Sequence, residues 1–274
     1  MNPTPLAGKV IVVVGGTTGL GLAGAAACVD AGARVVVVGR NAEHATAAAR
    51  RLGPNARSLV GDATQSDTAY RAVRTAIEAF GRLDGLYHVA GGSGRKRGDG
   101  PLDAITDDGW DHTLRLNLTS LFYSNRAAIQ QFLAQRSPGA ILNMGSVLGF
   151  SPSPRFFATH AYAAAKAAIE GLSRSAAAYY SPYDIRVNVV APALVETPMS
   201  QRAVGDEAIM RYVVSKQPLD GASGHEGEIA GGRVGRPGDL DAAVVYFLSD
   251  QSRFVTGQTL AIDGGWSVTE GQVE

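Results

Sequence analysis

The stretch Val10-Ile11-Val12-Val13-Val14-Gly15-Gly16-Thr17-Thr18-Gly19-Leu20-Gly21 joins five apolar residues to a glycine-rich turn. An unbroken apolar run of this length predicts a strand that is buried on both faces, as in a parallel sheet. The small residues from 20 to 31 then predict a helix that ends at Gly32. Glycines at such a junction let the backbone turn sharply and approach a pyrophosphate at the helix N-terminus. We therefore expect a dinucleotide-binding unit here, and a merely tight turn is the less favoured interpretation.

The same alternation of strand and helix continues along the chain. Predicted strands follow at 35–38, 58–60, 85–89, 140–144, 185–190 and 258–262, and predicted helices at 43–52, 66–80, 107–135 and 160–180. Parallel strands joined by helical crossovers are the simplest explanation of this order. The sequence thus predicts an α/β fold, a Rossmann-type doubly wound parallel sheet of about seven strands with helices on both faces.

No change of composition divides the chain, so we expect a single domain over residues 1–274. The least regular stretch runs from 199 to 237, and unstructured connections of that length are uncommon in compact domains unless they are functional. We interpret it as a substrate lid.

Composition narrows the classes of function. The chain has 25 Lys and Arg against 25 Asp and Glu, so its net charge gives no basis for attracting nucleic acid or an anionic membrane. Cys28 is the only cysteine, which excludes a disulfide framework and a multi-thiolate metal site, and no metal is expected. No apolar run reaches transmembrane length, and the first residues lack the features of a signal peptide. We expect a cytoplasmic protein.

The end of the second predicted strand bears on the identity of the dinucleotide. The residues Val38-Gly39-Arg40-Asn41 offer no carboxylate to a ribose 2′-hydroxyl, whereas Arg40 offers a planar fork suited to a 2′-phosphate. NADP is therefore predicted as the cofactor and NAD is less favoured, with a solvated arginine as the alternative interpretation. Asp62 could receive an adenine amino group or serve as a cap or turn residue, and both interpretations stay open.

Tyr162 and Lys166 lie four residues apart on a predicted helix and therefore project from the same face. An ammonium beside a phenol stabilises the phenolate and lowers the pKa of the phenol, so that it can exchange a proton with a carbonyl or an alcohol. This spacing alone is common by chance. Ser146, at the end of the fifth predicted strand, and Asn117, inside the helix before it, make a catalytic set the better interpretation.

With these residues the chain resembles the short-chain dehydrogenase/reductase family, in its compact single-domain branch, which is similar to 3-oxoacyl-carrier-protein reductases. The resemblance extends from Lys9 to Gly265. Besides the glycine loop, Tyr162 and Lys166, it rests on Asp62-Ala63, Ala90-Gly91, Leu116-Asn117-Leu118, Asn143-Met144-Gly145-Ser146, Val187-Asn188-Val189-Val190-Ala191-Pro192, Thr197-Pro198-Met199, Gly232-Arg233-Val234-Gly235-Arg236-Pro237, Thr256-Gly257-Gln258 and Asp263-Gly264-Gly265.

The resemblance implies a role for each site residue. Tyr162 would be the general acid/base, Ser146 would orient the reacting oxygen, and Lys166 would hold the nicotinamide ribose and lower the pKa of Tyr162. Asn117 would anchor a water that relays protons, and Thr197 and the backbone at Val195 would meet the carboxamide. The implied cofactor-binding residues are Gly15, Thr17, Thr18, Gly19, Leu20, Gly21, Arg40, Asp62, Ala63, Ala90, Gly91, Tyr162, Lys166, Pro192, Val195 and Thr197. A homotetramer is implied as well.

Four features depart from the family pattern. The family commonly has Thr where Val14 stands, Asn where Val89 stands and often Gly where Ala193 stands. The first two changes put local hydrogen bonding in doubt rather than the chemistry. The interval from Ser146 to Tyr162 is also longer than usual, and its extra residues, 151–157, border the substrate side.

The substrate is expected to be a small carbonyl compound or alcohol. Phe150, Phe156 and Phe157 are equally well interpreted as a pocket or as core, and Arg95-Lys96-Arg97 could meet an anion, although a solvated loop is favoured. Fatty-acyl ketones, steroid-like ketones, sugars and polyols all remain open, because the fold does not choose among them.

Two other classes of protein are alternatives to a reductase. A sugar-nucleotide epimerase or dehydratase needs a larger C-terminal region, and a catalytically silent NADP-binding sensor or scaffold would lack the catalytic residues that are present here. An NADP-dependent oxidoreductase that transfers hydride between a nicotinamide and a ketone or secondary alcohol is therefore the preferred hypothesis.

Overall fold

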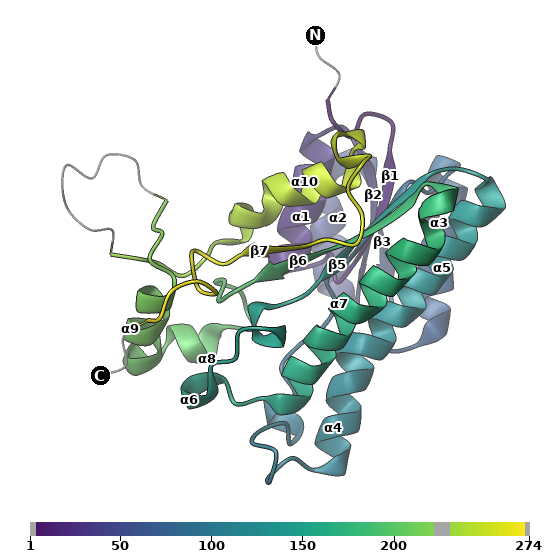
Figure 1. Cartoon of the computed structure of the whole chain (residues 1–274). Helices are drawn as coiled ribbons and strands as arrows, with labels where there is room; N and C mark the ends of the chain where they lie inside the picture. Colours follow the sequence, from purple (N-terminus) through teal and green to yellow (C-terminus); the bar gives the residue numbers. More distant parts are fainter. Residues whose placement is uncertain (1–3, 222–230, 272–274) are drawn as a thin grey trace.

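The valine runs form the centre of a parallel sheet in the order β3-β2-β1-β4-β5-β6-β7 (Figure 1). A computed structural model describes residues 4–221 and 231–271 of the chain. The strands are β1 (Val10–Val14), β2 (Arg34–Gly39), β3 (Ala56–Val60), β4 (Gly85–His88), β5 (Gly139–Met144), β6 (Ile185–Pro192) and β7 (Thr259–Ile262). The helices are α1 (Gly19–Asp30), α2 (Ala42–Leu52), α3 (Ser66–Phe80), α4 (Asp107–Leu114), α5 (Ser120–Gln135), α6 (Pro154–Phe157), α7 (His160–Tyr180), α8 (Gln201–Val204), α9 (Glu207–Lys216) and α10 (Asp241–Leu248).

Helices cover both faces of this sheet. In Figure 1, α1, α2 and α10 lie against one face and α3, α5 and α7 against the other. The side chains of β1 divide accordingly, because alternate residues of a strand point to opposite faces. Ile11 and Val13 pack in the core cluster beneath α1 and α10, and Val10, Val12 and Val14 pack in the one beneath α3 and α5. The predicted doubly wound α/β fold is therefore confirmed.

The segment predicted as one helix over 107–135 is continuous but changes its winding in the middle. Between α4 and α5, a π-helical turn occupies Arg115–Thr119. Such turns are rare and occur often at functional sites. The turn contains Asn117, whose side chain it directs inward, where it is fully buried.

All of the strands run parallel, so their carboxyl ends meet at one edge of the sheet. The strand order reverses between β1 and β4, and ligands of doubly wound sheets bind in the crevice outside such a reversal. The small helices α4, α6, α8 and α9 gather at this end of the molecule (Figure 1). The fold therefore brings the loops that follow six of the strands to one place.

The segment predicted as a lid, 199–237, contains more regular structure than the sequence suggested. Its described part includes α8 and α9, and residues 222–230 lie outside the described residues. Ile209 and Val213 of α9 are buried in a third core cluster with Val147 and Trp266. In this structure α9 is thus packed against the substrate side of the sheet. Among the described helices, none is long and apolar enough to span a membrane.

Candidate active site

The glycine loop after β1 forms the floor of the crevice. Gly15 has a φ of +87°, and a Cβ at this position would lie 2.6 Å from the backbone N of Ala90. A Cβ on Gly21 would overlap the carbonyl oxygen of Gly15. The chain therefore needs glycine at both positions to turn this tightly from β1 into α1 against the loop that follows β4.

The start of α1 suits an anion. Thr18 occupies the N-cap but its side chain forms no capping hydrogen bond, and the first turn of the helix contains no acidic residue. The N–H groups and the positive end of the helix dipole are thus left to another negative group. These residues fit the pyrophosphate of a dinucleotide.

The predicted ribose and adenine contacts lie at the ends of β2 and β3. Arg40 follows β2 and is exposed. The Oδ1 atom of Asp62 accepts hydrogen bonds from the backbone N–H and the hydroxyl of Thr64, both at 2.9 Å. For this oxygen the structure confirms the turn interpretation of Asp62, and Ala63 beside it is half-buried.

The loop that follows β6 approaches the glycine loop. A Cβ on Gly19 would lie 3.6 Å from Cγ2 of Thr197, which places these two predicted cofactor-binding residues side by side. Pro192 is the last residue of β6, and Val195 is held by an isolated bridge to Gly235. The structure thus brings the predicted nicotinamide end to the same crevice as the phosphate loop.

Tyr162, Lys166 and Ser146 meet beyond the end of β5. Tyr162 and Lys166 share one face of α7, and the Lys166 Nζ lies 5.5 Å from the centroid of the Tyr162 ring. The side chain of Ser146 is close enough to the phenol of Tyr162 for hydrogen bonding to lower the pKa of that phenol. The Lys166 Nζ donates to the carbonyl oxygen of Met144 at 2.8 Å. The predicted catalytic trio is therefore assembled as a connected group.

Burial sets the protonation of this group. Burial raises the pKa of Tyr162 above its usual value, and the hydrogen bond with Ser146 acts in the opposite direction. Burial also lowers the pKa of Lys166 to about 7. The sequence predicted a lowered pKa for Tyr162, and the ligand-free chain differs because desolvation of the phenol outweighs the other influences. At neutral pH the phenol carries its proton.

Asn117 fastens the loop after β4 to the helical layer. Its Oδ1 accepts the N–H of Gly92 at 3.0 Å, and its Nδ2 donates to the carbonyl oxygens of Gly92 and Thr113, each at 2.9 Å. Both hydrogens of the amide are therefore used within the protein. A Cβ on Gly91 would lie 2.6 Å from Oδ1 of Asn117 and 3.7 Å from Nζ of Lys166. Asn117 thus holds Gly91 next to the lysine, and its predicted role in a water relay stays a prediction.

Asp99 is a site residue that the sequence analysis missed. Its carboxylate is buried and accepts the backbone N–H groups of Ala161 and Tyr162, both at 3.0 Å. It therefore caps the N-terminus of the catalytic helix from a loop that lies 62 and 63 residues earlier in the chain. A capping residue at that separation has no local sequence signature, because the usual N-cap signal stands next to its helix.

Gln217 was missed for the same reason. This buried side chain accepts the N–H of Leu194 at 3.0 Å and donates to the carbonyl oxygens of Leu194 and Arg233, each at 3.2 Å. It joins the segment after β6, the end of α9 and residues 231–235. The backbone near Val195 is thereby fixed from two sides.

The three phenylalanines in and next to the insertion 151–157 differ in burial. Phe156 and Phe157 are half-buried in the third core cluster, where the ring of Phe156 lies tilted against that of Tyr212, with centroids 5.2 Å apart, and Phe157 meets Trp266 edge-on at 5.9 Å. Phe150 is exposed. The core interpretation therefore accounts for two of the three phenylalanines.

The three basic residues after β4, Arg95, Lys96 and Arg97, also differ in burial. Arg95 is half-buried and donates to the carbonyl oxygen of Phe156 at 3.0 Å, whereas Lys96 and Arg97 are exposed. The interpretation as a solvated loop therefore holds for Lys96 and Arg97, whereas Arg95 contacts the insertion 151–157.

The valines at positions 14 and 89, which depart from the family pattern, do not interrupt the backbone hydrogen bonds at the ends of β1 and β4. The carbonyl oxygen of Val14 accepts the N–H groups of Val89 at 2.8 Å and of Ala90 at 2.9 Å. His88, next to Val89, is buried and contacts Ser124 at 3.0 Å and the carbonyl oxygen of Ala90 at 3.1 Å. The β1–β4 junction is therefore held by hydrogen bonds despite the valines.

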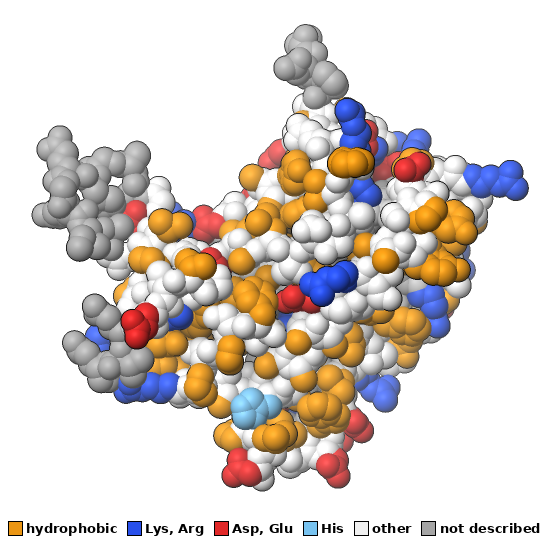
Figure 2. Space-filling view, in the orientation of Figure 1, with side chains coloured by type: hydrophobic (Ala, Val, Ile, Leu, Met, Phe, Trp, Pro, Cys, Tyr) orange, Lys and Arg blue, Asp and Glu red, His pale blue; other side chains and the backbone are white. Residues whose placement is uncertain are grey.

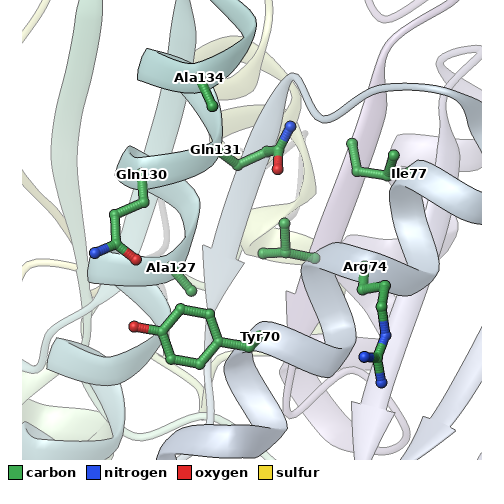
Figure 3. Close-up of a pocket in the computed structure, with 8 residues that line it drawn as sticks. Tyr70, Arg74, Ile77, Ala127, Gln130, Gln131 and Ala134 are labelled. Atoms are coloured by element: carbon green, nitrogen blue, oxygen red, sulfur yellow. The ribbon is translucent and has the colours of Figure 1, made fainter.

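A surface hollow of about 420 Å³ lies away from this site, between α3 and α5 (Figure 3). Figure 3 shows Tyr70, Arg74 and Ile77 on one side of it and Gln130, Gln131 and Ala134 on the other. None of the predicted catalytic residues lines this hollow.

Comparisons with known proteins agree with this geometry. Residues 14–267 match the family model described as Enoyl-(Acyl carrier protein) reductase. An NADP-dependent (R)-specific alcohol dehydrogenase of Lentilactobacillus kefiri is 34% identical over 266 residues, which cover 96% of this chain and 98% of that protein. A 2-dehydro-3-deoxy-D-gluconate 5-dehydrogenase of Escherichia coli strain K12 is 32% identical over 268 residues, covering 95% and 96%.

The fold is also shared with solved structures. The crystal structure of gox2181 superposes with a TM-score of 0.85 at 30% identity, covering 98% of this chain and all of the other. Sequence similarity over nearly the full length, the same strand arrangement and an assembled Tyr-Lys-Ser group all point to one conclusion. The chain belongs to the short-chain dehydrogenase/reductase family and is an oxidoreductase that acts on CH–OH groups with NAD(P).

Proposed function

We propose that the protein is an NADP-dependent reductase of ketones, or dehydrogenase of secondary alcohols, with Tyr162 as the general acid/base. The observation that carries the proposal is the connection of the Tyr162 hydroxyl to Ser146, with Lys166 one helical turn away. These groups lie at the carboxyl edge of the sheet, beside the glycine loop. A carbonyl at this position would receive its proton from the phenol.

The protonation states favour reduction at neutral pH. Burial keeps the pKa of Tyr162 above its usual value, so the phenol carries a proton to donate. In this proposal the Ser146 hydroxyl hydrogen-bonds the same substrate oxygen. The nicotinamide, when bound, supplies or accepts the hydride, and Lys166 holds its ribose. Each transferred hydride is thus matched by a proton on oxygen.

The preference for NADP rests on Arg40. It follows β2 directly, is exposed, and has no acidic residue beside it at the end of that strand. A guanidinium pairs with a 2′-phosphate in two parallel hydrogen bonds. One relative with 34% identity is also named as NADP-dependent.

We further propose that the protein assembles as a homotetramer in the cytoplasm. Exposed apolar side chains lie on α5, on α7, in β7 and in the segment just before β7, and Figure 2 shows hydrophobic side chains spread over the face on which α7 lies. They are Phe122, Leu133, Tyr179, Phe254 and Leu260. Apolar area of this kind is more stable when it is covered by another subunit.

The cytoplasmic location is supported by the single thiol of the chain. That thiol, of Cys28, is buried and free, which suits a reducing compartment.

A ketone panel with NADPH tests the proposed reaction. We expect the wild type to oxidise NADPH in the presence of at least one ketone, and Tyr162→Phe to lose most of the turnover while still binding NADPH, as measured by fluorescence. Tyr179→Phe is the matched control, because Tyr179 lies on the same helix but is exposed. Near-normal turnover by Tyr162→Phe would mean that another group donates the proton to the carbonyl. Binding of NADPH without turnover of any ketone or alcohol would instead support a sensor or scaffold.

A further inference from the structure

A group of arginines surrounds Phe156, in the insertion between Ser146 and Tyr162. The carbonyl oxygen of Phe156 accepts hydrogen bonds from Nη2 of Arg95 at 3.0 Å and from Nη2 of Arg202 at 3.3 Å. The guanidinium of Arg155 lies over the ring of the same residue, 5.1 Å from its centroid. Three positive charges therefore gather around one residue.

These arginines come from three separate segments at the carboxyl edge of the sheet. Arg95 belongs to the loop after β4, Arg155 to α6 and Arg202 to α8. The loop of Arg95 begins at Gly91, beside Lys166, and ends at Asp99, which holds the backbone of Tyr162. Arg95 and Arg202 thus stand on loops that frame the substrate side of the site.

Two of the three arginines, Arg95 and Arg202, are not paired with an acidic side chain in the described part of the chain. Within residues 4–221 and 231–271, neither Arg95 nor Arg202 forms a salt bridge. The acidic group that acts on Arg95 is Asp99, but both of its oxygens accept backbone N–H groups of α7. Burial lowers the pKa of Arg95, and the charge of Arg202 lowers it further. A shared carbonyl oxygen does not neutralise two guanidinium groups.

We propose that Arg95 and Arg202 bind a carboxylate on the substrate, at the end remote from the reacting carbonyl. This inference rests on the proposed function and adds a substrate class to it, namely oxo acids and hydroxy acids. Each guanidinium presents a planar fork that matches a carboxylate, and charge-assisted hydrogen bonds of this kind are about twice as strong as neutral ones. A carboxylate would relieve the repulsion between the two cations.

Pairs of substrates that differ only in charge test the proposal. Acetoacetate and levulinate are each compared with their methyl esters, with NADPH oxidation as the readout. For the better of the two acids, we expect kcat/KM to exceed that of its ester by about tenfold or more. Arg95→Gln and Arg202→Gln should each lower kcat/KM for the acid by about tenfold or more, mainly through KM, and leave the ester unchanged. Arg97→Gln is the matched control, because Arg97 is exposed on the same loop.

The outcomes separate this inference from the proposed function. If the ester is reduced as well as the acid, and the arginine variants do not discriminate between them, the carboxylate site is wrong while the reductase stands. If neither compound is reduced, the site is tested by calorimetric titration of levulinate into the NADPH complex. Binding that Arg95→Gln and Arg202→Gln abolish would support the site, and absence of binding by the wild type would overturn it. Unchanged turnover of the ester shows that a variant is folded.

Discussion

The carboxylate of Asp99 accepts the backbone N–H of Tyr162 at 3.0 Å, so the loop after β4 holds α7 at the residue that is proposed to exchange the proton. The second oxygen accepts the N–H of Ala161 at the same distance. Thr159 is the N-cap residue of α7 by position, but its side chain forms no capping bond. Asp99 therefore satisfies N–H groups that would otherwise be orphaned, and its charge complements the helix dipole.

Asp99→Ala should both destabilise the protein and slow catalysis. Loss of an N-cap costs about 0.5–2 kcal/mol, and the first turn of α7, which carries Tyr162, should fray. We expect kcat to fall while the affinity for NADPH changes little, because Lys166 lies one turn deeper in the helix. Asp99→Asn keeps one acceptor oxygen, so its stability and its kcat should lie between those of the wild type and those of Asp99→Ala. Urea unfolding and steady-state kinetics measure these effects.

A variant at a second N-cap distinguishes an effect of Asp99 on the position of Tyr162 from an effect on stability alone. Thr106 caps α4 by accepting the N–H of Gly109 at 3.0 Å. Thr106→Ala should lower the unfolding free energy by a similar amount without lowering kcat. If Asp99→Ala were destabilised to the same degree and kept its full kcat, Asp99 would be a structural residue only.

Arg40→Ala should change the choice of cofactor. Removal of the guanidinium should cost about 1.5–3 kcal/mol of binding free energy toward NADPH, the range for hydrogen bonds to charged groups, and little toward NADH. Dissociation constants of both cofactors check this. Equal or tighter binding of NADH by the wild type would refute the NADP preference.

Introducing an acid next to Arg40 should not by itself create an NAD enzyme. A Cβ on Gly39 would overlap the Oγ1 of Thr17, which is buried. We expect Gly39→Asp to weaken NADPH and NADH together, because Thr17 belongs to the glycine loop and has to move. The double variant Gly39→Asp with Thr17→Gly should recover NADH binding. Tight NADH binding by the single variant would show that the loop yields without cost.

His88 should make the stability of the protein depend on pH in the acid range. Burial, and then the charge of Lys166, lower the pKa of His88 to about 3, below its usual value of 6.5. The unfolded chain therefore binds more protons than the folded one between pH 6.5 and pH 3, so stability falls as the pH decreases through this window. His88→Gln should flatten that part of the curve, as measured by urea unfolding from pH 7 to pH 4. An unchanged slope in the variant would mean that other groups produce the acid sensitivity.

The sequence predicted those features whose determinants are local. The valine runs gave the strands, because burial on both faces leaves an unbroken apolar pattern. The spacing of Tyr162 and Lys166 placed them on one helix face, and the structure brings Ser146, which was also predicted, close to Tyr162. Helices 66–80 and 160–180 were predicted with the bounds that the structure shows.

What the sequence did not show depends on contacts between distant segments. Asp99 lies 63 residues before Tyr162, and Gln217 lies 23 residues after Leu194, so neither contact leaves a periodic signal. The pKa of Tyr162 was expected to be lowered because charge was considered without desolvation, and desolvation is a property of the packed site. α8 and α9 were overlooked because both are short, and the glycines between Gly221 and Gly235 make the segment 199–237 irregular as a whole.

The segment that carries α9 is attached to the molecule by a small core. A helix of ten residues is marginal by itself, so α9 depends on Ile209 and Val213, which pack with Val147 and Trp266. Tyr212 adds a hydrogen bond from the hydroxyl of Ser153 at 2.9 Å and an aromatic contact with Phe156. Elements with few buried contacts open at a lower free energy than the central strands.

We therefore predict that residues 204–216 act as a lid that is held weakly in the free enzyme and more firmly when NADP and substrate are bound. Closure would exclude water from the hydride path. Amide hydrogen exchange should be fast in α9 relative to α7 without ligands and should slow when NADPH and an oxo acid are added. Tyr212→Phe, which loses the bond from Ser153, should accelerate exchange in α9 but not in α7. Strong protection of 204–216 in the free enzyme, unchanged by ligands, would show that α9 is a fixed part of the fold.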